Sequence, residues 1–290
     1  MSQATKENAI DKLDNIGLNI MYPDKWYMDC IPDVTECKTL VEFVIKAQKG
    51  LFNLKSHLIG TSDVFSHQIC TAHFDLTFVN ALYSPNHNVI LIYPALFLPP
   101  LVPENVSEAY EYAAFTTIGH ELTHAFDDSG AQYDKYGNKN NWWTVADKME
   151  FEERQKLLVD CYNHLEGAPD ILPGKYANGT VTLEENIADL GGLNIALDAY
   201  TEYLQEQGYF GSVLEDQQRK FFESYADIWS CKYGEEYIKD RMDGKRPDSH
   251  ALPQERINGV VMNMDIWYKL YNVTRENKLY LPPEKRTRIW

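Results

Sequence analysis

A His-Glu-x-x-His pattern at residues 120–124 holds the side chains best suited to chemistry. His120 and His124 lie four positions apart, so on an α-helix both imidazoles project from one face, where they can bind a single metal ion such as zinc. Glu121 lies about 100° round the helix from His120, beside the metal, where a general base would meet a metal-bound water. Because a five-residue pattern recurs by chance, an exposed helix that carries two histidines is the alternative.

An acidic segment later in the chain, residues 183–192, could complete a metal site. A tetrahedral catalytic zinc usually takes three protein ligands, and His2Glu is a known set. Glu184 and Glu185 compete for the third place. Glu185 is favoured because Asp189 lies four residues later on the same helical face, where it could accept the outer N–H of a metal-bound histidine. The alternative is a solvated acidic face.

Helices are expected to carry and support these residues. Asn105 or Ser107 can cap a helix that continues through the metal motif to Gly130, with residues 115, 118, 122 and 126 as its core stripe. Apolar residues at helical spacing predict further helices, including one at 40–58 whose apolar positions are assigned to the core. The other predicted helices span 5–16, with residues 9, 10, 13 and 16 on one face, and 145–165, 183 onward, 214–242 and 260–271.

A β-hairpin is expected beside the metal motif. Residues 77–83 and 89–92 read as strands around the turn cluster at 84–88, and 22–24 reads as another turn. A strand next to a metal cleft could bind an extended peptide main chain, with Asn80 adding hydrogen bonds. A purely structural hairpin is the alternative. His250 and Arg256 lie in a predicted polar loop, where exposed residues without function are the simpler interpretation.

Composition limits the possible partners. The chain has 290 residues, 44% of them hydrophobic, and a formal charge of −16, which opposes binding to a phosphate backbone. Five cysteines without a Cys-x-x-Cys pair indicate neither a sulfur-rich zinc site nor a redox pair, and they lean only weakly towards a reducing compartment. The polar N-terminus lacks the apolar core of a signal peptide, and the apolar run at 89–102 is too short and proline-rich to span a bilayer. No nucleic acid and no membrane segment are expected.

Several stretches, in this order, resemble the catalytic region of the neprilysin and endothelin-converting-enzyme family of zinc peptidases. They are the Asn-Ala-Leu-Tyr strand at 80–83, the metal motif at 119–128, Trp-Trp-Thr at 142–144, Glu-Asn-Ile-Ala-Asp with Gly-Gly at 185–192, the spacing of His250 to Arg256, and Arg-Ile-Trp at 288–290. The resemblance covers nearly the whole chain. It implies an α+β, mainly α fold: one thermolysin-like (gluzincin) catalytic domain over residues 1–290, with a small β-sheet beside the active-site helix.

The resemblance also implies a role for each candidate residue. The implied ligands of one Zn2+ per chain are His120, His124 and Glu185. The residues implied to orient the two histidines are Asp189 and Asp127. The implied catalytic groups are Glu121 as general base, His250 as donor to the developing oxyanion, and Asp189. The implied substrate-binding residues are Asn80 and Ala81, which hold the backbone, and Arg256, which binds a carbonyl.

Four residues depart from the family pattern. Leu82 stands where an aromatic residue is frequent, Ala125 and Glu184 where glycine is common, and Thr287 where many animal members have a disulfide cysteine. Glu184 would add negative charge close to the metal. This charge would either strengthen zinc binding or blunt the nucleophile.

Family members are usually more than twice as long, with a helical N-terminal domain that closes over the active site. This chain begins close to where the catalytic half would begin. Three interpretations compete: a fragment or truncated gene model, a stand-alone peptidase with an open cleft, or one half of a two-chain enzyme. An open cleft would exclude water poorly and leave apolar surface bare, which predicts weak activity or a separate lid domain or chain.

The sequence therefore predicts a zinc metalloendopeptidase that hydrolyses small peptides on the amino side of bulky apolar residues. The alternative is a weakly active or inactive zinc-fold module that binds peptides or needs a partner chain for its lid. The compartment stays open: cytoplasmic if Met1 is the native start, and extracellular if the chain is part of a longer ectoenzyme.

Overall fold

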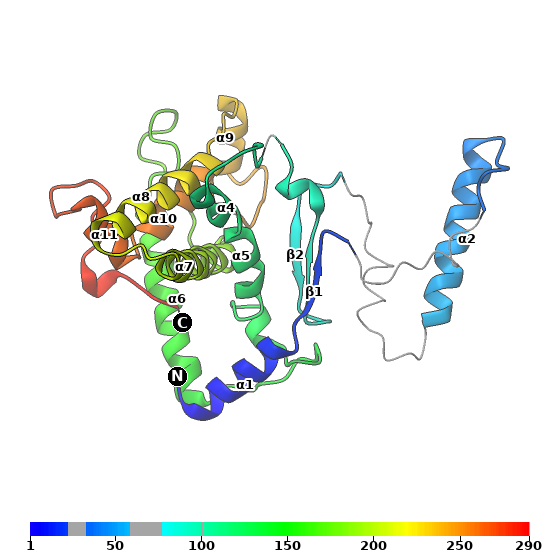
Figure 1. Ribbon diagram of the computed structural model, residues 1–290, viewed down its shortest axis with the longest axis horizontal. Coiled ribbons are helices and arrows are strands. Elements are labelled where there is room, and N and C mark those ends of the chain that lie inside the picture. The colour runs from blue at the N-terminus through cyan, green and yellow to red at the C-terminus, as the bar shows by residue number, and fades with distance from the viewer. Residues whose placement is uncertain (23–32, 59–76, 100, 290) are drawn as a thin grey trace.

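The computed structural model describes residues 1–22, 33–58, 77–99 and 101–289. Helices form most of this part of the chain, and a small β-sheet lies along one side of them (Figure 1). The predicted α+β, mainly α class is therefore confirmed. The predicted turn at 22–24 extends beyond the described residues.

The sheet has three strands in the order β1-β3-β2: β1 (Gly17–Ile20), β3 (Val89–Ile92) and β2 (Ala81–Ser84). β2 and β3 pair antiparallel, with Ala81 opposite Ile92, which confirms the hairpin. The first hairpin strand begins at Ala81 and not at residue 77. β1 pairs parallel with β3 and was not predicted, because four residues after a helix give too short a pattern. β3 is buried, whereas β2 is an edge strand.

The predicted long helix through the metal motif is two helices. α4 (Glu108–Ala114) is capped by Ser107, whose hydroxyl accepts from the Tyr110 amide, and α5 (Thr116–His124) follows after a break at Phe115. The predicted core stripe is wrong at Phe115, which is 42% exposed, and its other three positions, residues 118, 122 and 126, are half-buried. The buried face of α5 instead includes Gly119, His120 and Thr123. A helix–helix contact, and not an apolar stripe, fixes this face.

The contact is made with α7 (Leu183–Glu206), which crosses α5 at a pair of glycines. A Cβ on Gly192 would lie 2.6 Å from the amide nitrogen of His120, and a Cβ on Gly119 would lie 2.8 Å from the carbonyl oxygen of Gly192. Only glycine allows the two backbones to approach so closely. The crossing brings the first turns of α7, with Glu185 and Asp189, against the histidines of α5.

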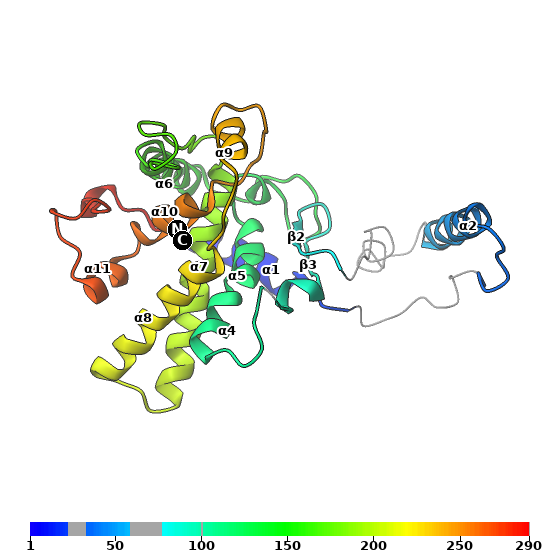
Figure 2. The ribbon, with the colours of Figure 1, turned by 90° about the horizontal axis from the view of Figure 1, so that it is seen from above.

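The main core surrounds α7 (Figure 2). α7 is packed against α5, α4, α6 (Val145–Asn163), α8 (Gly211–Ile228) and α10 (Pro253–Val261). Large side chains that are fully buried fill this space: Tyr162, Tyr200, Tyr225, Phe221, Leu158, Ile187, Leu190, Leu193, Leu204 and Val260. The core therefore holds the middle of α7 rigidly behind the metal motif.

The C-terminal third is helical, but it is divided differently from the prediction. α9 (Glu235–Met242) is separate from α8, and α11 (Asp265–Tyr271) is separate from α10. α10 begins at Pro253, so Arg256 belongs to a helix and not to the predicted loop. Proline at the first helical position explains this start, since its fixed φ suits a helix and its missing N–H is not needed there. Short 3-10 turns span Pro94–Phe97, Gly130–Gln132 and Pro283–Lys285.

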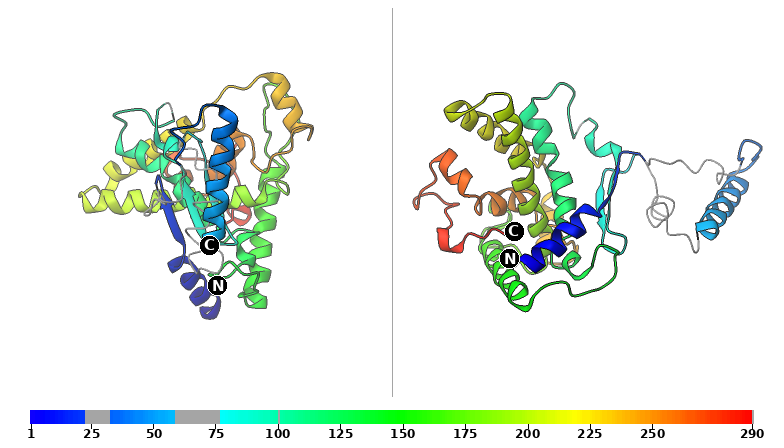
Figure 3. Two further views of the ribbon diagram at one scale, coloured as in Figure 1. Left: turned by 90° about the vertical axis from the view of Figure 1, so that its right-hand side faces the viewer. Right: turned by 60° about the horizontal axis from the view of Figure 1, so that its bottom comes forward.

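The N-terminal helix α1 (Gln3–Asp14), dark blue in the right-hand view of Figure 3, buries an unexpected face. Its buried residues are Thr5 and Lys12, whereas Ile10 and Leu13 are 47% and 46% exposed. Of the four apolar positions predicted to share one face, these two are exposed, and residues 9 and 16 are half-buried. Polar anchors attach α1 to the rest of the fold instead.

α2 (Leu40–Leu58) has the predicted bounds but not the predicted burial. It stands apart from the other helices in Figures 1 and 2, and Leu40, Phe43 and Val44 are 76%, 44% and 41% exposed. The assignment of these three positions to the core is therefore wrong for this chain, although the helical spacing was read correctly. None of the helices in the described ranges is long and apolar enough to cross a membrane.

Candidate metal centre and cleft

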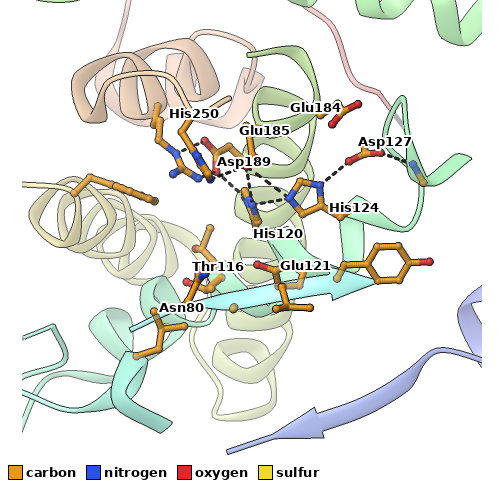
Figure 4. Close-up of a pocket in the computed structure, with 18 of the residues that line it drawn as sticks. Asn80, Thr116, His120, Glu121, His124, Asp127, Glu184, Glu185, Asp189 and His250 are labelled. Carbon is orange, nitrogen blue, oxygen red and sulfur yellow. Dashed lines mark hydrogen bonds and ion pairs between the residues drawn. The ribbon is translucent and has the colours of Figure 1, made fainter. Parts of the chain in front are cut away.

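The histidines of α5 and Glu185 of α7 converge at one point (Figure 4). His120 Nε2 lies 2.9 Å from His124 Nε2. Glu185 Oε2 lies 3.3 Å from the first of these nitrogens and 3.6 Å from the second. Among the described residues, these three side chains form the group whose donor atoms could hold a metal ion.

The donor set fits zinc. Ligand atoms about 2.1 Å from a tetrahedral zinc would be about 3.4 Å from one another, close to the three observed separations. Both histidines turn Nδ1 towards a carboxylate, so the two Nε2 atoms and a buried Glu185 oxygen face each other. Two nitrogen lone pairs and a carboxylate need a shared cation at this point, which is either a proton or a metal ion.

Asp189 fixes His120 and is itself held by Arg256. His120 Nδ1 lies 2.8 Å from Asp189 Oδ1, and the Arg256 guanidinium donates to both carboxylate oxygens at 2.6 and 2.7 Å. Burial raises the pKa of Asp189, but the Arg256 charge and the bond to His120 outweigh it and lower the pKa to about 2. The Arg256 guanidinium also stacks on Trp229, 4.0 Å from the ring centre.

Asp127 holds His124 in the same way. Its Oδ2 lies 2.5 Å from His124 Nδ1, and its Oδ1 accepts from the Ser129 and Gly130 amides at 2.8 and 2.7 Å. Burial alone would lower the pKa of His124, yet bonds to Asp127 and Glu185 raise it to about 10. The carboxylates around the two imidazoles therefore favour a positive charge at the centre.

Glu121 is buried beside the centre, on the side of strand β2. Its Oε2 is enclosed and has no hydrogen-bond partner within the described part of the chain. Burial raises the pKa of the Glu121 carboxyl, against the charges of the two histidines. Glu184 differs from its neighbour Glu185: it is exposed, lies away from the donor atoms and points towards Asp127 (Figure 4).

A cleft of about 430 Å³ opens over this centre. The other predicted site residues, Asn80, Ala81, His250 and Arg256, all line it, so tertiary structure brings together every candidate residue of the sequence. Edge strand β2 forms one wall, and Trp229 and Arg256 lie at another. Apolar side chains of Leu96, Ala113 and Ile228 also line the cleft.

His250 is held by Glu185 and by two residues, Asp248 and Arg241, that the sequence did not single out. Its Nε2 lies 3.1 Å from Glu185 Oε2, and its ring Nδ1 lies 2.8 Å from Asp248. Arg241 of α9 binds both the Asp248 carboxylate and, at 2.6 Å, the His250 carbonyl. Arg241 and Trp229 were missed because no local pattern marks a residue that supports a loop or another side chain from a different helix.

Comparison with known proteins identifies the family of this chain. The model of peptidase family M13 matches residues 80–287. The neutral endopeptidase of Lactococcus lactis subsp. lactis (strain IL1403) is 32% identical over 298 residues, which cover 100% of this chain and 43% of that protein. Human neprilysin is 32% identical over 216 residues, which cover 73% of this chain and 28% of neprilysin. This chain thus spans less than half the length of these relatives.

Solved structures of similar proteins share the fold. The zinc metalloprotease ZMP1 of Mycobacterium tuberculosis, in complex with an inhibitor, superposes with a TM-score of 0.77 at 31% identity, over 100% of this chain and 43% of that one. PepO from Lactobacillus rhamnosis HN001 superposes with a TM-score of 0.74 at 29% identity, over 99% of this chain and 42% of that one. With the family model matching most of the sequence and the metal motif inside the matched region, this chain belongs to peptidase family M13.

Proposed function

We propose that this chain is the catalytic domain of a zinc-dependent endopeptidase that hydrolyses small peptides. The convergence of His120 Nε2, His124 Nε2 and Glu185 Oε2 in an open cleft carries the proposal. In this proposal the three residues hold one zinc ion. When bound, zinc polarises the scissile carbonyl and lowers the pKa of a water molecule to about 7.

Glu121 acts as the general base. Its buried, unpaired oxygen lies beside the centre, and burial raises its pKa, which strengthens it as a base. It takes a proton from the attacking water and passes that proton to the leaving nitrogen as the peptide bond breaks. The products are a carboxylate and an amine.

His250 donates a hydrogen bond to the carbonyl oxygen as negative charge develops there. Its ring lines the cleft, and the hydrogen bond to Glu185 raises its pKa, which favours the form that donates a hydrogen bond. Losing one such donor typically raises the barrier by about 2.7 to 4 kcal/mol. Arg256 extends the same wall and binds a substrate carbonyl.

Edge strand β2 binds the substrate backbone. Asn80 and Ala81 line the cleft. Among the described residues β2 pairs with β3 on one side only, so an extended peptide can add to its other edge. We further propose that the apolar lining near Leu96 and Ile228 accepts a bulky apolar side chain just after the scissile bond.

We also propose that residues 1–290 form one domain and that a second domain or chain covers the cleft. The chain spans 43% of the length of the L. lactis relative, and α2 exposes Leu40, Val41 and Ile45 at 76%, 67% and 59%. Monomeric sedimentation together with full activity would argue against such a cover.

The test uses a quenched fluorescent peptide with Phe or Leu after the scissile bond. Zinc-loaded wild type should cleave it, and both chelator treatment and Glu121→Gln should abolish cleavage. Glu121→Gln should still bind zinc, because Glu121 is not a ligand. Failure of a folded, zinc-loaded wild type to cleave would contradict catalysis by this chain alone and favour a binding module or half-enzyme.

A further inference from the structure

Lys12 of α1 is a buried charged side chain whose hydrogen-bond partners lie far from it in the sequence. It is 1% exposed, and its ammonium donates to three backbone carbonyls: those of Ala125 at 2.6 Å, Gly130 at 2.7 Å and Tyr133 at 2.9 Å. Ala125 lies 113 positions later in the chain. Three ammonium hydrogens and three carbonyls make a fully satisfied buried group.

These carbonyls belong to the turn that follows α5. The same turn wraps around Asp127, whose carboxylate accepts from the Ser129 and Gly130 amides and reaches His124. Gly130 is shared: its amide binds Asp127, and its carbonyl binds Lys12. A Cβ on Gly130 would lie 1.9 Å from the His124 carbonyl, so the turn lies directly against the metal helix.

We propose that Lys12 is a positioning residue of the metal centre, which clamps the 125–133 turn so that Asp127 can orient His124 for metal binding. The inference rests on the proposed zinc function. Lys12 lies outside residues 80–287, the segment that matches the family model, so it adds an N-terminal element to the centre.

The charges around Lys12 support a clamp. Asp127 and Asp134 are the carboxylates that act on it, and the Tyr83 and Phe126 rings lie 5.8 and 5.5 Å from its nitrogen. Burial lowers the pKa of Lys12 to about 8, against these two carboxylates, so the side chain remains largely charged at neutral pH. A neutral replacement would remove a donor from all three carbonyls. Those of Gly130 and Tyr133 would keep the Tyr133 amide and the Trp142 indole N–H, both at 3.0 Å, but within the described residues the Ala125 carbonyl would keep no donor, and the turn would relax at that end.

Lys12→Met tests the proposal against Thr5→Val as the matched control. Thr5 is the other buried anchor of α1, and its hydroxyl binds Asp147 at 2.6 Å, away from the 125–133 turn. Both variants weaken the attachment of α1, but only Lys12→Met removes the clamp. Zinc affinity is measured by competition with a chromophoric chelator, and the visible spectrum of the cobalt-loaded protein reports ligand geometry.

We expect Lys12→Met to bind zinc about tenfold more weakly, as for other groups that orient a metal-bound histidine, and to change the cobalt spectrum. Thr5→Val should be less stable than wild type, but it should keep the zinc affinity and the cobalt spectrum of wild type. In the metal-free protein, amide hydrogens of Ser129 and Gly130 should exchange faster in Lys12→Met and not in Thr5→Val.

Equal zinc affinity and equal amide exchange in the two variants would overturn the proposal and leave Lys12 as a plain anchor of α1. If Lys12→Met does not fold, Lys12→Gln, which keeps one donor group, is compared with Thr5→Val by the same criteria. A wild type that binds no zinc would instead refute the proposed function, while the amide-exchange comparison would still decide the role of Lys12.

Discussion

Gly192 of α7 lies so close to His120 of α5 that a Cβ on the glycine would be 2.6 Å from the histidine amide nitrogen. The same Cβ would be 2.8 Å from the Thr116 carbonyl oxygen. These neighbours are backbone atoms, which cannot rotate away. The distance between the two helices therefore depends on residue 192 having no side chain. The separation of Glu185 from the histidines depends on it as well.

Gly192→Ala should push α5 and α7 apart. Overpacking of this kind costs about 1–3 kcal/mol of unfolding free energy, and the displaced Glu185 should also weaken zinc binding. Urea unfolding and chelator competition measure the two effects. Gly234→Ala is the control, because nothing lies within 4 Å of its added Cβ and its φ of −67° suits alanine. A Gly192→Ala protein as stable as wild type would contradict the close crossing.

Glu185 and its neighbour Glu184 should respond differently to the same substitution. Glu185→Gln removes a donor atom of the centre, whereas Glu184→Gln changes an exposed carboxylate that lies away from it. Zinc at 100 times its dissociation constant should stabilise wild type by about 2.7 kcal/mol. Thermal unfolding with and without zinc should show this gain in Glu184→Gln and not in Glu185→Gln. The reverse result would assign the third ligand to Glu184.

Removal of Arg256 should leave the buried Asp189 carboxylate without its cationic partner. Asp189 is 2% exposed and would lose both guanidinium bonds, and breaking such a buried pair costs about 3–5 kcal/mol. Arg256→Met should also weaken zinc binding about 10- to 100-fold, since Asp189 orients His120. Arg286→Met is the control: Arg286 likewise stacks on an aromatic ring, that of Tyr268, and bonds a carboxylate away from the centre. Equal zinc affinity in the two variants would count against the coupling.

Glu255 should make the folding stability depend on pH, independently of metal binding. It is 2% exposed; one oxygen accepts from the Leu252 amide at 2.7 Å, and the other has no partner within the described residues. Burial raises its pKa from 4.5 to about 7, although the Leu252 bond and the Arg241 charge oppose the shift. The folded state thus binds more protons than the unfolded state between these values, so this group lowers stability as pH rises through that range.

Glu255→Gln should remove this dependence. Between pH 4.5 and 8 the stability of wild type relative to the variant should fall by about 3 kcal/mol, the free energy of the pKa shift. Urea unfolding of metal-free protein at several pH values measures it. Glu276→Gln, at an exposed position, should follow wild type at every pH. Parallel stability curves for wild type and Glu255→Gln would show that Glu255 does not titrate in this range.

The candidate metal site could be predicted from short patterns, because helical periodicity alone places His120 and His124 on one face. The same periodicity favoured Glu185 over Glu184, and it is Glu185 whose oxygen lies beside the two histidine nitrogens. The residues that support the centre were harder to predict from the sequence. Arg241 and Trp229 carry no motif, and they act only because α8 and α9 fold back to the His250 loop and to Arg256.

By itself, the sequence determined the candidate metal ligands, the hairpin, most helices and the family, since each depends on contacts between residues close in the chain or on patterns of residue type. Tertiary structure alone decided which faces are buried. It divided the helix of the metal motif at Phe115, left Leu40, Phe43 and Val44 of α2 exposed and buried Lys12. Burial depends on what packs against a face, and partners more than a hundred positions apart, such as Lys12 and Ala125, leave no local trace in the sequence.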